Sequence, residues 1–416
     1  MRIVTCILHR SGNVAGTKGE RMYFNHRATY LALTLTLFLS AVFQAKAQSS
    51  STLSVSPNLS APKDEEEKPY KPTGKVAFTL YSRQTEDSFS RSHQGTIIIN
   101  PDFSAKYGDY ISLNLELAGL FGSGNASNFW TDDGKAPNSI LLHEAAAKLN
   151  LHKNVYIKAG ALKATLNPLV SIMPVTFGGA FMATQEEWKI GADDSNISIS
   201  AFQGIPSSGT VTKRIYDDGT QAYFLTQTLA GMLKVNTGTE LKVAATRFQF
   251  ENLSTNVATD SYFLGNSLSS FEGSSKSFRF RNGFMGTESG ATVKQEIGKH
   301  EVFAFVSTII NDQAAEGKNK GRMVGGSVKA VFGNYIVRPS YTRFNYDADV
   351  TPAVYTTMTS RFQNRDGYRV GIDIELKKER LALKNYYIKM DLKDANPYLA
   401  DREIYNIAVE AKYDIF

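Results

Sequence analysis

The chain has 416 residues, with 46 Lys and Arg against 40 Asp and Glu and a formal net charge of +6. Six of the basic residues and one of the acidic residues lie in residues 1–47, which leaves 40 basic and 39 acidic side chains in the rest of the chain. This balance gives no electrostatic reason to expect a nucleic-acid partner. The single cysteine, Cys6, excludes a disulfide framework within the chain.

Residues 1–47 have the organisation of a secretory signal peptide. Basic side chains within residues 21–27 precede the apolar run 28–43, and the small-residue site Ala45-Lys46-Ala47 follows. The run is shorter than the roughly 20 residues that a helix needs to cross a bilayer, so a helical anchor is the weaker alternative. The leader is long for its type, and Met22 is an alternative start.

Residues 48–73 are rich in Ser, Pro and charged side chains. Such a composition cannot bury enough apolar surface to fold. We therefore expect a disordered N-terminal tail between the signal peptide and the folded part of the chain.

From Gly74 to Phe416 the sequence alternates as half-buried strands do. Between Tyr110 and Leu120, one face carries Ile111, Leu113, Leu115 and Leu117, and the other carries Ser112, Asn114 and Glu116. A period of two with one apolar and one polar face is the pattern of a strand rather than a helix. The same pattern returns along the rest of the chain.

The connections between these strands fall into two alternating classes. Short turns are expected at 108–109, 152–154, 193–195, 236–238, 298–300, 333–334 and 377–379. Longer connections are expected at roughly 83–93, 121–139, 165–185, 204–220, 252–287, 311–321, 347–366 and 393–401. Strict alternation predicts about 16 antiparallel strands with all short turns at one end, and the strand boundaries are least certain between 252 and 298.

The predicted fold class is all-β, a transmembrane antiparallel barrel over residues 74–416. Closure gives every backbone group a partner, and the apolar faces point outward to lipid. Aromatic residues near strand ends, among them Tyr81, Tyr107, Phe250, Tyr335 and Tyr346, favour girdles at the membrane interfaces.

The signal peptide, the alternating strands and the terminal Phe416 together resemble bacterial outer-membrane porins, of the general or phosphate-selective kind. In that family the third long loop folds into the pore as a constriction, and the third long loop here is 165–185. Its segment Pro174–Gly179 (PVTFGG) is similar to the family's Pro-Glu-Phe-Gly-Gly element but lacks the carboxylate. Residues 155–168 resemble the strand that enters this loop in phosphate-selective porins.

The resemblance implies a water-filled channel of the bacterial outer membrane for passive diffusion of small hydrophilic solutes or ions. It implies short turns and the N-terminal tail in the periplasm, a homotrimer, and recognition of Phe416 by the outer-membrane assembly machinery. Phe416 lies out of phase with the apolar residues of the last strand, which weakens that signal. The apolar residues expected at the constriction are Leu169, Ile172, Met173, Phe177 and Phe181.

Strand periodicity predicts which charges face the lumen. The inward candidates are Glu116, Lys158, Lys163, Arg338, Arg369, Asp373 and Glu375. Their signs are mixed, and the loop 165–185 carries no acid, which favours an anion-preferring or unselective pore. Most of these charges are expected to serve as wall residues rather than to select a solute.

Two other classes of function stay open. A structural or adhesive outer-membrane barrel with no open channel would use its long loops outside the cell. A soluble carbohydrate-binding protein would leave a large apolar face in water, which is unfavourable. An enzyme is not expected, because the few histidines lack nucleophile and carboxylate partners, and neither a metal site nor a cofactor is indicated.

Overall fold

The computed structural model of this chain describes residues 70–88, 91–124, 138–164, 166, 168–171, 180–192, 194–206, 221–269, 279–356, 363–396 and 399–415. The predicted signal peptide and most of the predicted tail lie outside these residues. So do Ile172, Met173, Phe177 and Phe416. The described residues form sixteen strands, one α-helix and one short 3-10 helix.

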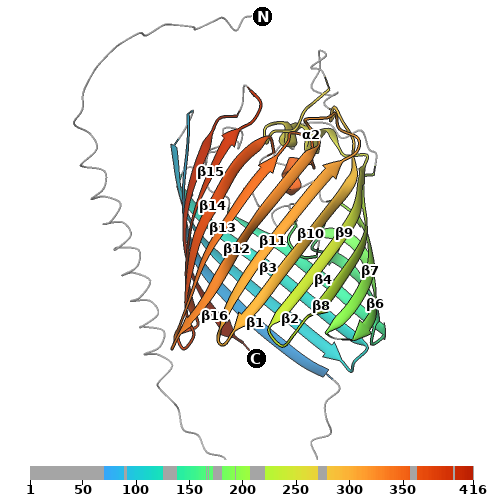
Figure 1. The fold of residues 1–416 in the computed structure, drawn as a ribbon, viewed down its shortest axis with the longest axis vertical. Helices are drawn as coiled ribbons and strands as arrows, with labels where there is room; N and C mark the ends of the chain where they lie inside the picture. The colour runs from blue at the N-terminus through green and yellow to red at the C-terminus, as the bar shows by residue number, and fades with distance from the viewer. Residues whose placement is uncertain are drawn as a thin grey trace, which may run out of the picture. The chain divides into compact units, whose positions relative to one another are not determined.

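The strands are β1 (Tyr70–Asp87), β2 (Arg91–Tyr107), β3 (Ile111–Gly124), β4 (Ser139–His152), β5 (Val155–Leu162), β6 (Phe181–Ala192), β7 (Ser195–Ile205), β8 (Tyr223–Lys234), β9 (Thr239–Glu251), β10 (Phe284–Ile297), β11 (His300–Asn311), β12 (Lys320–Phe332), β13 (Tyr335–Tyr346), β14 (Arg365–Leu376), β15 (Leu381–Leu392) and β16 (Arg402–Asp414). Each pairs antiparallel with its neighbours in the chain, and β1 pairs with β16, so the sheet closes. Figure 1 shows the strands tilted around this ring. The predicted antiparallel barrel is confirmed.

The outer face of the barrel is apolar, because every second side chain of a strand points outward. On β3 the outward Ile111, Leu113 and Leu115 are exposed, as are Trp188 and Ile190 on β6. A continuous belt of exposed large apolar side chains around a closed barrel is the lipid-facing surface of an outer-membrane barrel. It excludes the soluble alternative, since such a surface would aggregate in water.

The two ends of the barrel differ. Short turns join strands at one end, the turn end, where the C-terminus also lies (Figure 1). The longer connections gather at the other, the loop end. The first of these is shorter than predicted, because β1 and β2 continue in register to Glu86 and Arg91. Strand β1 also begins at Tyr70 rather than near Gly74, because residues 70–73 pair with the turn end of β2.

The predicted aromatic girdles are only partly correct. Tyr107 and Tyr335 are exposed on the outer face at the turn end, as a girdle requires. Phe250 and Tyr346 are instead buried inside the barrel. Tyr81 also faces inward, since its register partner Ala408 shares the face opposite the exposed Tyr405. Proximity to a strand end does not decide which face a side chain takes; the parity of its position does.

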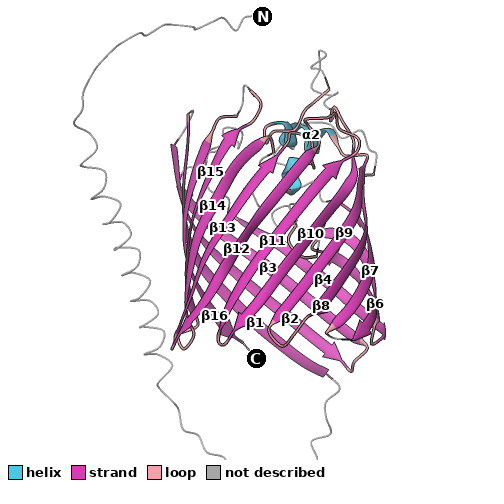
Figure 2. Cartoon of the chain, in the orientation of Figure 1, coloured by secondary structure: helices cyan, strands magenta, loops and turns pink. Residues whose placement is uncertain are grey.

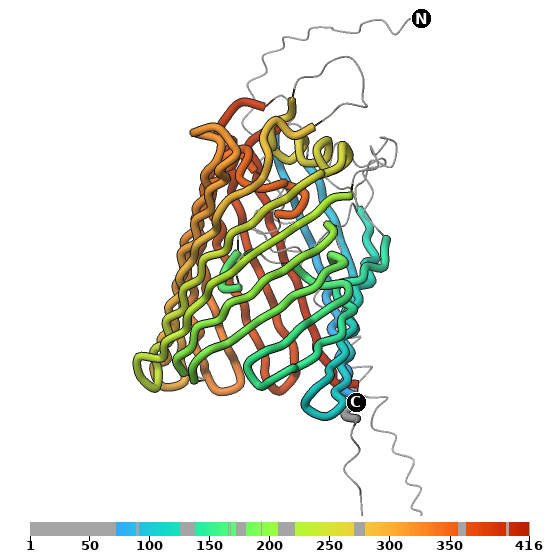
Figure 3. The backbone as a smooth tube through the Cα atoms, turned by 90° about the vertical axis from the view of Figure 1, so that its right-hand side faces the viewer, coloured from blue at the N-terminus to red at the C-terminus, as the bar shows by residue number. Residues whose placement is uncertain are grey.

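Two short helices occupy the loop end (Figure 2). Helix α2 (Thr255–Tyr262) is capped by the Ser254 hydroxyl, which accepts from the Val257 amide, and it lies at the mouth of the barrel. The 3-10 helix η2 (Ala353–Tyr355) lies inside the ring of strands, as the orange segment of Figure 3 shows. Neither these helices nor any other among the described residues is long and apolar enough to cross a membrane.

Candidate functional site: the barrel lumen

The inner wall differs between its two ends. Near the turn end, the inward side chains of β1, β2 and β16 include exposed charged groups, for example Lys75, Asp102 and Lys412. Near the loop end the inward side chains of β8–β13 and β16 are buried, including Phe224, Phe248, Ile309, Tyr346 and Ile404. We call these two regions the turn half and the loop half of the lumen.

A polar recess of about 270 Å³ opens in the wall of the turn half. Its lining residues come from β1–β4 and are Thr73, Lys75, Asp102, Ser104, Asn114, Glu116 and Glu144. The three carboxylates occupy consecutive register positions on β2, β3 and β4. Like charges directly opposite each other on neighbouring strands destabilise a sheet, so this row needs compensating cations.

Two predicted lumen lysines provide that compensation. Lys163 forms an ion pair with Glu116, and the Lys158 Nζ lies 2.8 Å from the Glu144 Oε1. The His143 Nδ1 lies 3.3 Å from the Glu116 Oε1. The register between β3 and β4 shifts beside Glu116, so His143 is the extra residue of a β-bulge. The bulge brings His143 close to Glu116. Three of the sequence-predicted residues, Glu116, Lys158 and Lys163, therefore meet in one cluster.

The other predicted charges lie on β13 and β14, away from that cluster. Arg338 is the register partner of Asp373, and Glu375 is the partner of the buried Ile336. The Arg369 guanidinium lies 4.2 Å from the centroid of the Tyr386 ring, which is cation–π geometry. Arg369 and Asp373 alternate with the exposed outward Val370 and Ile372, so they face the lumen.

An aromatic cluster occupies the loop half. Phe181 packs edge-on against Phe224, with ring centroids 5.7 Å apart, and against Tyr355, at 5.4 Å. Phe250 also stacks on Tyr355, at 5.7 Å and nearly parallel. Phe181 was expected in the constriction loop, but it is the first residue of β6 and belongs to the wall. Phe181 is part of the sheet because it pairs with Leu162, the last residue of β5.

The segment between β5 and β6, which we call the inner loop (residues 163–180), begins inside the barrel. Ala164 and Leu166 are completely buried, and Leu169 is half-buried. The Ser171 hydroxyl donates to the Glu288 Oε2 at 2.9 Å. The Ser307 hydroxyl of β11 donates to the Oε1 of the same carboxylate at 2.8 Å. Glu288 lies on β10, which is not a neighbour of β5 in the sheet, so Ser171 lies against a distant part of the wall.

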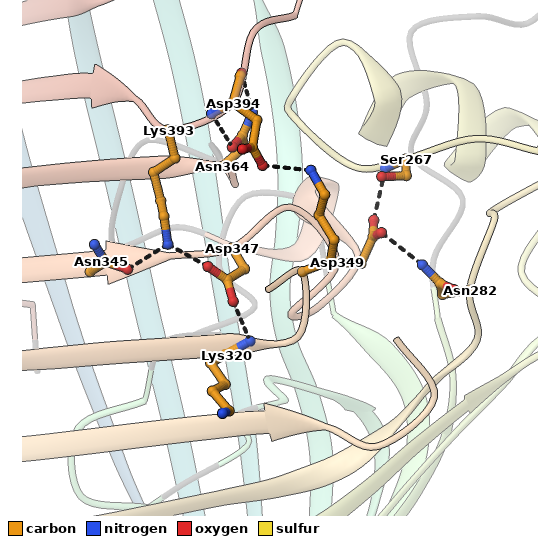
Figure 4. Close-up of polar contacts among 10 residues, drawn as sticks. Ser267, Asn282, Lys320, Asn345, Asp347, Asp349, Asn364, Lys393 and Asp394 are labelled. Carbon is orange, nitrogen blue, oxygen red and sulfur yellow. Dashed lines mark hydrogen bonds and ion pairs between the residues drawn. The ribbon is translucent and has the colours of Figure 1, made fainter. Parts of the chain in front are cut away.

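Polar contacts at the mouth join the β9–β10 connection to the β13–β14 connection and its neighbours (Figure 4). The Asp349 carboxylate accepts from the Ser267 amide at 2.7 Å and from the Asn282 Nδ2 at 2.8 Å. Asp347 accepts from the Lys320 amide at 2.8 Å and forms an ion pair with Lys393. These loops are separated by many residues in sequence, so the contacts are tertiary and hold the mouth as one unit.

The sequence did not single out Asp102, Glu144 or Glu288. Asp102 carries the same signal that identified Glu116, a charge in phase with the polar face of an alternating strand. Glu144 has the parity of the outward Ile140 and Leu142, and only the bulge at His143 turns it inward. Glu288 lies on β10, whose start was uncertain because residues 276–298 contain several glycines and little alternation. Among the described residues, no group of three or more His, Cys, Asp or Glu is placed to hold a metal ion.

No protein-family model matches the sequence, and no curated protein matches it. Solved structures do match. OprB of Pseudomonas putida is 11% identical, with a TM-score of 0.52 over 83% of this chain and 94% of that one. OpdQ of Pseudomonas aeruginosa is 11% identical, with a TM-score of 0.43 over 83% and 99%. OmpT of Vibrio cholerae, an outer membrane protein in a trimer form, is 10% identical, with a TM-score of 0.46 over 82% and 99%.

At such low identity the OprB match shows a shared fold, and with it the resemblance to outer-membrane porins is confirmed at the level of architecture. A closed, even-stranded antiparallel barrel with an apolar outer face is the form of bacterial outer-membrane proteins. The predicted outer-membrane location is therefore confirmed by the same architecture.

Proposed function

We propose that this barrel is a porin, a water-filled channel for passive diffusion of small hydrophilic solutes or ions, narrowed by the inner loop. The observation that carries the proposal is the hydrogen bond from Ser171 to Glu288. It ties a segment that leaves the wall at β5 to the wall at β10, and a segment with both attachments reduces the open cross-section of the lumen.

The chemistry of the wall supports passage of water and ions through the turn half. On β1–β4 its inward side chains include charged and polar groups, which line a recess that is large enough for water molecules. The cations and carboxylates largely neutralise each other, as in the Lys158–Glu144 and Lys163–Glu116 pairs. We therefore propose a channel with weak ion selectivity, in which Arg338, Arg369, Asp373 and Glu375 act as wall charges.

A matched pair of serine substitutions tests the role of the inner loop. Ser171→Ala and Ser307→Ala each remove one hydrogen bond to Glu288, but only Ser171 belongs to the inner loop. In planar bilayers we expect Ser171→Ala to raise the single-channel conductance and its noise, and Ser307→Ala to leave both unchanged. Wild-type protein that inserts without conductance steps would refute the channel. Equal effects of the two substitutions would refute the constriction.

A structural or adhesive barrel without an open channel is the second candidate. It is favoured by the burial of the inward side chains around the loop half, from Phe224 on β8 to Ile404 on β16. In that case the purified protein would show the heat-dependent gel migration of a folded barrel but no conductance. Binding to a surface outside the cell would then depend on the loops at the loop end.

We also propose that the chain reaches the outer membrane after removal of residues 1–47, with Phe416 as its assembly signal and a homotrimer as its final state. Mass spectrometry of the protein from membranes identifies the mature N-terminus and distinguishes it from a start at Met22. Deletion of Phe416 should lower the amount of folded barrel in the membrane. Chemical crosslinking in the membrane should give a trimer band.

A further inference from the structure

We propose that Asn266 is a positioning residue that sets the width of the loop half. In this proposal its side chain holds the segment 347–356, which carries η2, inside the barrel mouth. The held segment in turn keeps the rings of Phe181, Phe224, Phe250 and Tyr355 packed together where the inner loop joins the wall. This inference rests on the proposed channel function. It states that one amide side chain, that of Asn266, controls how far the mouth of the barrel is open.

The Asn266 side chain makes three hydrogen bonds, all to the backbone of the segment 347–356. Its Nδ2 donates to the carbonyl of Ala348 at 2.7 Å and to the carbonyl of Thr351 at 2.9 Å. Its Oδ1 accepts from the amide of Ala353, the first residue of η2, at 2.7 Å. Asn266 is 1% exposed, so these bonds are shielded from water, and their loss would leave buried polar groups unpaired.

The backbone around Asn266 is fixed on both sides. The Gln363 amide donates to the Leu264 carbonyl at 2.8 Å. Gly265 has a φ of +113°, and a Cβ there would lie 2.4 Å from the Gln363 carbonyl oxygen, so only glycine fits this close approach. On the other side, Asp349 accepts from the Ser267 amide (Figure 4). Asn266 thus presents its amide from a rigid position.

The held segment places the Tyr355 ring in the aromatic cluster. The ring contacts Phe181, the first residue of β6, and Phe250, at the loop end of β9. The pKa of the Tyr355 hydroxyl is raised by burial, so the side chain stays neutral there. If the Asn266 bonds were lost, the segment would have fewer ties to the mouth. Tyr355 could then leave the cluster and open space beside Phe181.

The first experiment compares Asn266→Ala with Asn334→Ala in planar bilayers. Asn334 is the control, because its amide side chain also donates and accepts hydrogen bonds, two in all, but in an exposed turn at the far end of the barrel. We expect Asn266→Ala to raise the conductance roughly twofold and to add rapid current fluctuations. Asn334→Ala should match the wild type. An unchanged conductance in Asn266→Ala would overturn the proposal.

A second readout does not depend on conduction. Ala353 is fully buried, and the only cysteine of the chain is Cys6 in the predicted leader, so Ala353→Cys introduces a single thiol into the mature barrel. A water-soluble maleimide should label it slowly in the otherwise wild-type protein and roughly tenfold faster with Asn266→Ala. Equal labelling rates would overturn the proposal. If the wild type does not conduct but the labelling rates differ, the channel function fails and the positioning role stands.

A rescue experiment separates positioning from general destabilisation. The Val354 amide lies 3.5 Å from the Ser261 hydroxyl, so these two residues of η2 and α2 are neighbours, and we choose them as the pair of positions for a designed disulfide. In the Asn266→Ala background the oxidised Ser261→Cys/Val354→Cys variant should regain the wild-type conductance and lose it on reduction. Failure of the disulfide to restore the conductance, with heat-modifiable migration intact, would overturn the proposal.

Discussion

The turn half and the loop half of the lumen are built from the same sixteen strands but are held by different interactions. In the turn half the wall is stabilised by the strand ladder itself, with short turns and exposed ion pairs. In the loop half, the inner loop and the connections that carry α2 and η2 pack inside or over the wall. The comparison shows that a β-barrel can combine a solvated vestibule and a packed core within one sheet, because only the connections at one end are long enough to fold inward.

The largest expected difference between the halves concerns a phenylalanine pair. Phe248 in the loop half is fully buried, and Phe303 in the turn half faces the lumen half-exposed. Phe248→Ala should lower the free energy of unfolding by about 3–5 kcal/mol, because it leaves a cavity among packed rings. Phe303→Ala should cost about 1 kcal/mol, since part of its surface already contacts water. Urea unfolding in detergent measures both, and equal losses would contradict a packed loop half.

A slightly smaller difference is expected between two ion pairs. Asp87 is 3% exposed and pairs with Arg402, which is 11% exposed, at 2.6 Å in the loop half. Asp414 is 58% exposed and pairs with Arg380 at 2.8 Å at the turn end. Asp87→Asn should cost about 3 kcal/mol, because it removes the negative charge that lies 2.6 Å from a buried guanidinium.

Asp414→Asn is the control for that substitution and should cost less than about 1 kcal/mol, because water screens an exposed pair. The same unfolding measurement compares the two variants. A loss at Asp414 as large as the loss at Asp87 would show that burial does not distinguish the two ends of the barrel.

The smallest expected effect concerns ion selectivity in the turn half. Asp102 faces the polar recess without a salt bridge to any described residue. Asp102→Asn should shift the reversal potential in a salt gradient toward anion preference. The free energy of unfolding should change by less than about 0.5 kcal/mol. The shift should shrink as salt is raised, because ions screen the wall charge. A reversal potential that does not move would place the recess outside the ion path.

The sequence predicted the fold well because the strand signal is local. Alternation such as Ile111–Leu113–Leu115 identifies a strand and its two faces within a few residues, and strict alternation of turn lengths identifies the antiparallel order. The same periodicity placed Glu116 and Lys158 on the lumen side, but it could not say that they meet. Their cluster depends on the register between β3, β4 and β5 and on the bulge at His143.

By itself, the sequence determined an outer-membrane barrel with an apolar exterior and a lumen of mixed charge. The tertiary structure alone decided how the loop half is filled. Ser171 and Glu288 are 117 residues apart in the chain, and Asn266 and Ala353 are 87 apart. No local pattern encodes such pairs, because Ser171, Glu288 and Asn266 are ordinary polar residues of a loop or wall until folding buries them. Burial then makes each hydrogen bond obligatory and fixes which loop enters the barrel.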